Sequence, residues 1–289
     1  MDQKDITYYI PHGSRWPIIG AFGLFFFMWG AGHWINGMVT EGRSLLALGA
    51  AILVFMLFGW FGEVIRESNQ GIFNKRVDAT FRLGMMWFIF SEVMFFGAFF
   101  SALFYSRGLQ VPWLGGEGHG VVTHFYLWKG YASTWPTNGP AMLGGPFGTM
   151  LPWGKPLLNT LILLSSSITL TIAHYALKDG KRSRMLWFLG VTPILGALFL
   201  WFQAHEYIEA YTHLNLTLHS GIYGTTFFML TGFHGLHVTL GTIMLTVIFF
   251  RAWRGDFRKD HHFAFEAVAW YWHFVDIIWL ALFLFVYIM

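Results

Sequence analysis

The 289-residue sequence contains no cysteine, which excludes disulfides, thiolate metal sites and iron–sulfur clusters. Charged residues are also scarce, at 11% of the chain, whereas a soluble domain carries about 25%. Hydrophobic residues make up 55% of the sequence and aromatic residues 20%. This composition excludes an ordinary soluble domain. The small net charge of +3 gives no reason to expect a nucleic-acid partner.

Long apolar runs are what the sequence does have. A run of about 20 residues crosses a hydrocarbon core of roughly 30 Å as a helix, and a helix satisfies its own backbone groups in lipid. We therefore predict an all-α integral membrane protein with seven transmembrane helices, forming a single membrane domain over residues 1–289. The predicted spans are 16–38, 43–65, 81–107, 156–177, 185–211, 218–250 and 262–287.

The basic residues predict the orientation of these spans, because loops on the inner side of a membrane are enriched in Lys and Arg. If the N-terminus lies inside, the inner segments hold 14 of the 18 Lys and Arg residues, from Lys4 onward. The sequence therefore predicts an N-in, C-out topology. A retinal protein is excluded, because the last span, 262–287, contains no lysine.

The segment 108–155 is predicted to be a long external loop. Its 11 glycines and 5 prolines are expected to prevent regular structure. Its aromatic content is unusual for a solvated linker, and two interpretations stay open: the loop folds over the protein's own helices, or it docks on a neighbour. Its aromatic residues include Trp113, Phe125, Tyr126, Trp128, Tyr131, Trp135 and Trp153.

Glu92 is the most unusual ionisable residue in a predicted span. It lies about ten residues, or roughly 15 Å, into the third span, and its sequence neighbours supply no cation. A carboxyl at this depth is costly, so we expect it to be protonated or to share a hydrogen bond. A proton-linked or lipid-linked carboxyl is the functional interpretation, and a neutral Glu bonded to a facing helix is the alternative.

Three histidines in the last two spans allow a second functional hypothesis. His234 and His237 share a helical face at i, i+3, and His273 lies mid-depth in the last span. Converging imidazoles can bind haem iron or copper, and Asp276 could support His273 as a ligand. Histidines in membranes also form hydrogen bonds between helices. The spacing leaves both interpretations open.

Four stretches carry a resemblance to a known family. They are Glu63–Ser68, Arg82–Phe96, Thr226–Val238 and His261–Asp276, in this order along the chain. Together they resemble subunit III of aa3-type cytochrome c oxidases over nearly the whole sequence. The seven spans fit this family, whereas subunit III of related quinol oxidases has five.

The resemblance implies an accessory, non-catalytic subunit of a proton-pumping oxidase that reduces oxygen to water in aerobic respiration. Its helices are expected in two groups, spans 1–2 and 3–7, around a V-shaped cleft filled with phospholipids. Such a subunit binds oxidase subunits I and II, stabilises subunit I and supports proton uptake. Haem a and copper belong to the partner subunits, and cytochrome c is contacted only indirectly.

The resemblance also implies which residues contact lipid or the neighbouring subunits. These are Arg66, Arg82, Glu92, His237 and Arg251, with no catalytic residue and no metal ligand. The competing hypothesis is a haem- or copper-binding membrane oxidoreductase that uses the three histidines named above. A bacterial plasma membrane is the expected location, and the mitochondrial inner membrane is the alternative.

Overall fold

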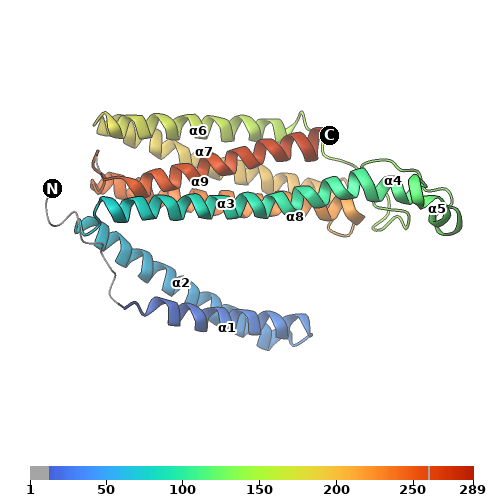
Figure 1. The fold of residues 1–289 in the computed structure, drawn as a ribbon, viewed down its shortest axis with the longest axis horizontal. Helices are drawn as coiled ribbons and strands as arrows, with labels where there is room; N and C mark the ends of the chain where they lie inside the picture. The colour runs from blue at the N-terminus through green and yellow to red at the C-terminus, as the bar shows by residue number, and fades with distance from the viewer. Residues whose placement is uncertain (1–12, 260) are drawn as a thin grey trace. The chain divides into compact units, whose positions relative to one another are not determined.

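The computed structural model describes residues 13–259 and 261–289 (Figure 1). Lys4, one of the predicted inner basic residues, lies outside them. The described chain contains no β-strand, only an isolated bridge between Arg258 and His261. Seven of its helices are long and apolar enough to cross a membrane. The predicted all-α fold with seven spans is therefore confirmed, while the orientation and the grouping around a lipid-filled cleft stay predictions.

The seven spans follow the apolar runs of the sequence. Two of them are extended by π-helical turns: α3 by η2 (Ser106–Gln110) and α9 by η4 (Phe283–Ile288). The spanning helices are α1 (Trp16–Ile35), α2 (Val39–Asn69), α3 (Lys75–Tyr105), α6 (Lys155–Lys178), α7 (Arg182–Thr212), α8 (Gly221–Arg254) and α9 (Phe263–Leu282).

The chain forms two compact units that divide between Leu83 and Gly84, within α3. In the first unit, α1 and α2 form a tightly packed hairpin (Figure 1). Glycines allow the two backbones to touch. A Cβ atom on Gly30 would lie 2.5 Å from the backbone nitrogen of Leu46, and one on Gly42 would lie 2.6 Å from that of Trp34.

The second unit is built around α9, which packs against α6 and α8. Trp272 and Trp279 of α9 are fully buried. Each donates its indole N–H to a hydroxyl of α6, Trp272 to Ser166 at 2.9 Å and Trp279 to Thr160 at 3.0 Å. A buried indole needs such an acceptor. These bonds fix the position of α9 along α6.

The prediction that 108–155 lacks regular structure is wrong for its first part. The π-helical turn η2 leads into α4 (Val111–Leu114), η3 (Gly118–Gly120) and α5 (Val121–Leu127). Pro112 lies in the first turn of α4, where no backbone N–H is needed. Gly116, with a positive φ angle of 96°, lies between α4 and η3, and Gly118, with a φ angle of 58°, is the first residue of η3. These glycines therefore separate the short helices without interrupting them.

The first of the two interpretations describes the second half of this loop, and docking on a neighbour stays a prediction. Its second half folds onto the protein's own helices: Asn215 donates a hydrogen bond to the Gly144 carbonyl at 2.9 Å, and the Trp135 ring packs edge-on against Tyr223 of α8. In α5, by contrast, Tyr126 is 77% exposed. Exposed apolar surface therefore remains on α5 and also near the end of the loop, where Trp153 is 71% exposed.

Candidate functional site

The structure brings together two of the predicted site residues, Glu92 of α3 and His237 of α8. The Oε2 atom of Glu92 lies 3.0 Å from Nε2 of His237. Both side chains are largely buried, with 21% and 11% of their surface exposed. The expected hydrogen bond of Glu92 is therefore made to a facing helix 145 residues away in the sequence.

The second ring nitrogen of His237 limits the protonation states of this pair. Its Nδ1 atom lies 2.6 Å from the carbonyl oxygen of Phe233, one turn earlier in α8. A carbonyl only accepts hydrogen bonds, so Nδ1 carries a proton. One further proton then lies between Glu92 and His237, donated by either the carboxyl or the imidazole. The pair has no net charge in both arrangements, which reduces its cost in an apolar setting.

Aromatic rings enclose this pair. The Phe96 ring of α3 packs edge-on against His237 with centroids 5.1 Å apart. The Tyr271 ring of α9 lies nearly parallel to the imidazole, with centroids 6.2 Å apart. The Tyr271 hydroxyl also donates to the backbone carbonyl of His237 at 3.3 Å. The pair therefore forms a small polar site between α3, α8 and α9.

Arg251 lies in the last turn of α8 and is not part of this site. It is 14 residues from His237, or about 21 Å along the helix axis. Its Nε atom lies 3.3 Å from Oδ2 of Asp256, and its guanidinium stands 4.8 Å above the Phe257 ring. Arg251 is 9% exposed, so this cation is mostly buried and paired within its own helix end.

Arg66 and Arg82 belong to the first compact unit. Arg66 lies in the last turn of α2 and is exposed. Arg82 donates a hydrogen bond from Nε to Oδ2 of Asp78 at 2.8 Å, an i, i+4 pair on α3. In the same unit, Glu63 accepts a hydrogen bond from the Trp16 indole at 2.5 Å. This last contact could not be predicted from the sequence.

The three histidines of the competing hypothesis do not share a centre. His234 contacts the backbone oxygen of Val275 at 3.2 Å, and Nδ1 of His273 lies 2.5 Å from the hydroxyl of Ser167. His237 is bound to Glu92, as described above. They therefore form the hydrogen bonds between helices that were the alternative interpretation. Their arrangement does not support haem or copper ligation by this set.

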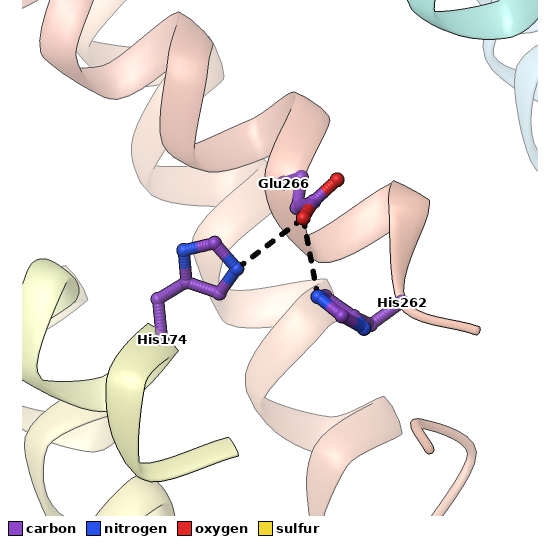
Figure 2. A group of neighbouring side chains, drawn as sticks. All are labelled: His174, His262 and Glu266. Carbon is purple, nitrogen blue, oxygen red and sulfur yellow. Dashed lines mark ion pairs between the residues drawn. The ribbon is translucent and has the colours of Figure 1, made fainter. Parts of the chain in front are cut away.

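A cluster that the sequence analysis missed lies where α6 approaches the start of α9. His174 of α6, His262 and Glu266 point toward one another (Figure 2). In the described parts of the chain, they are the only group of three His, Asp or Glu side chains with ligand atoms all within 4.8 Å of one another. His262 and Glu266 are four residues apart, a spacing that could have indicated them. His174 is 88 residues earlier in the sequence, so its participation requires the fold.

A comparison with protein-family models tests the family resemblance that the sequence motifs suggested. The model described as cytochrome c oxidase subunit III matches residues 6–289. The chain belongs to the cytochrome c oxidase subunit III family. It is 40% identical to cytochrome c oxidase subunit 3 of Triticum aestivum over 282 residues, which cover 97% of this chain and 96% of the relative. It is 39% identical to the protein of that name from Neotragus moschatus over 288 residues, covering 99% and 98%.

Membership in the cytochrome c oxidase subunit III family confirms the resemblance seen in the motifs. It makes the chain a subunit of an oxidoreductase complex in a membrane, and the seven spans make it a multi-pass subunit. The relatives' names do not decide between the two expected membranes, nor do they assign the roles of Arg66, Arg82, Glu92, His237 and Arg251. These roles stay predictions.

Proposed function

We propose that the chain is an accessory, non-catalytic subunit of a proton-pumping cytochrome c oxidase. In this role it stabilises subunit I, holds phospholipids and supports proton uptake, while haem a and copper lie in the partner subunits. Subunit II is a second partner, and cytochrome c is contacted only indirectly. We place the complex in a bacterial plasma membrane, with the mitochondrial inner membrane as the alternative.

The observation that carries this proposal is the apolar surface of the first three spans. In α2, 6% of the most apolar stretch is buried, and in α3 11%, compared with 56% in α9. A surface of this kind needs a cover of acyl chains or of another membrane protein. Glu92 lies on α3, and its neutral pairing with His237 is compatible with such a cover because no net charge is brought into contact with acyl chains.

Basic residues at helix ends supply the other half of a phospholipid site. Arg66 ends α2, Arg82 lies in the first turns of α3 and Arg251 lies in the last turn of α8. In the predicted topology all three lie toward the inner side of the membrane, where arginines attract anionic headgroups. We therefore assign them to headgroup binding, and Glu92 with His237 to the contact surface at greater depth.

The experiment compares Glu92→Ala and Arg251→Ala in the intact purified oxidase. Glu92→Ala leaves Nε2 of His237 without its partner, at a cost of about 1–3 kcal/mol, and Arg251→Ala removes a cation from the inner helix end. We expect less phospholipid retained per complex and fewer turnovers before inactivation in both variants. Phospholipid is measured by mass spectrometry of extracts and lifetime by continuous oxygen consumption.

Two other residues provide controls for these variants. Ser91→Ala changes an exposed hydroxyl that bonds to its own helix, and Arg43→Ala removes an exposed arginine near the start of α2, at the end that is predicted to lie outside. Both controls are expected to keep wild-type lipid content and lifetime. If Glu92→Ala and Arg251→Ala also keep them, the lipid assignment is wrong.

A further inference from the structure

The cluster of His174, His262 and Glu266 has the geometry of a metal site. Oε1 of Glu266 lies 3.1 Å from Nε2 of His262 and 3.6 Å from Nε2 of His174 (Figure 2). Zinc binds nitrogen and carboxylate oxygen at about 2.0–2.2 Å in tetrahedral sites, which places neighbouring ligand atoms about 3.4 Å apart. The two observed separations lie on either side of this value.

Both imidazoles are held so that the same ring nitrogen faces the carboxylate. Nδ1 of His262 lies 3.2 Å from the carbonyl oxygen of Arg258, to which it must donate, so the neutral ring keeps its lone pair on Nε2. The His174 ring stacks on Phe265 at 5.4 Å. The Nε2 atoms of both histidines are buried and make no hydrogen bond. Buried ring nitrogens without a hydrogen bond are unusual, and a metal ion would satisfy both.

We propose that Nε2 of His174, Nε2 of His262 and the carboxylate of Glu266 bind a zinc-type divalent cation. Two imidazoles and one carboxylate suit zinc, whereas magnesium and calcium prefer oxygen ligands throughout. Three protein ligands leave a fourth position for water. No redox chemistry is assigned to this ion, because zinc has a single stable oxidation state in proteins.

The surrounding charges show what competes with the metal. Lys178 stands one turn beyond His174 on α6, and Arg258 precedes His262, so the neighbourhood does not attract cations from a distance. The affinity must come from the three ligands themselves. A proton is the competing occupant: protonated imidazoles would pair with Glu266 as ordinary ion pairs.

A bound ion would join two parts of the second compact unit. His174 lies near the end of α6, while His262 immediately precedes α9 and Glu266 lies in its first turn. The ion would therefore fix the start of α9 against α6, at the opposite end of these helices from Thr160 and Trp279. This function is independent of lipid binding at the other proposed positions.

The first test counts zinc in the intact oxidase. The complex is treated with EDTA, dialysed against Zn²⁺ and analysed for metal by mass spectrometry. Glu266→Gln and His262→Gln are each expected to bind one zinc fewer per complex, or to bind it at least about tenfold more weakly. His219→Gln, which changes an exposed histidine between α7 and α8, is expected to match the wild type. An unchanged zinc count in Glu266→Gln and His262→Gln overturns the site.

A second test needs no variant and therefore stands even if a substitution disturbs folding. Crystals of the EDTA-treated wild-type complex are reloaded with Zn²⁺ and measured at the zinc absorption edge, which locates the ion directly. We expect an anomalous peak within about 2.2 Å of the ligand atoms of His174, His262 and Glu266, and none there after loading with Mg²⁺ instead. A zinc-loaded crystal without a peak at the cluster would show that the cluster holds only protons, and would overturn the proposal.

Discussion

At the scale of single residues, the hydrogen bond between Glu92 and His237 determines what a substitution at either position does. Glu92→Gln leaves an amide N–H that can donate to Nε2 of His237, so a hydrogen bond is kept. His237→Leu leaves the Glu92 carboxyl with an apolar neighbour and no partner from α8. An orphaned polar group in such a setting costs about 1–3 kcal/mol. We therefore expect His237→Leu to lower the melting temperature of this chain within the purified oxidase clearly more than Glu92→Gln does.

The complex is heated in steps, and the fraction of this chain that stays folded and bound to it is measured at each temperature. Ser91→Ala on the same helix is the control and is expected to unfold with the wild type. Equal losses in Glu92→Gln and His237→Leu would contradict this order, since they would show that the hydrogen bond between the side chains does not carry the stability.

At the scale of helices, apolar runs located every span but not its ends. The third span was predicted from residue 81, yet α3 begins at Lys75, and α2 extends from Val39 to Asn69 beyond the predicted 43–65. The additional turns contain charged residues such as Asp78 and Arg66. Hydropathy records only the part of a helix that lies in hydrocarbon, while the helix itself continues into the headgroup region.

Contacts between helices could not be predicted from the sequence, for a related reason. The depth of Glu92 followed from its position in a run, so its need for a partner could be predicted. That the partner is His237 depends on how α3 lies against α8, and nothing in either segment alone specifies this register. The same holds for His174, whose partners His262 and Glu266 lie at the start of α9. Residue positions within helices were predictable, and pairings between helices were not.

Close packing of α1 on α2 gives a prediction at this scale. Leucine at Gly30 would place a Cβ atom 2.5 Å from the backbone nitrogen of Leu46, which forces the two helices apart. Overpacking of this kind costs about 1–3 kcal/mol. We expect Gly30→Leu to increase protease cleavage of the first compact unit in detergent. Gly32→Leu is the matched control, because a Cβ at Gly32 has no atom within 4 Å. Equal cleavage in the two variants would show that the contact at Gly30 is not limiting.

At the scale of the whole molecule, the topology rests on the distribution of basic residues, and the lack of native cysteine makes it directly testable. Ser133 lies in the long loop and Ser183 at the start of α7, both exposed and separated by the single span α6. They therefore lie on opposite sides of the membrane. Ser133→Cys and Ser183→Cys are nearly isosteric changes that give one reactive thiol each in this chain.

The positive-inside rule predicts which of the two thiols faces outward. The segment before Ser183 holds Lys178, Lys181 and Arg182, so Ser183 is expected inside and Ser133 outside. In intact cells or right-side-out vesicles, a membrane-impermeant maleimide should label the chain with Ser133→Cys, and label Ser183→Cys only after permeabilisation. Labelling after permeabilisation in both variants shows that neither thiol is covered by a partner subunit. The reverse order of labelling would place the N-terminus outside. Arg66, Arg82 and Arg251 would then lie on the side away from the anionic inner leaflet. In that case both the predicted topology and the assignment of these arginines to headgroup binding would be wrong.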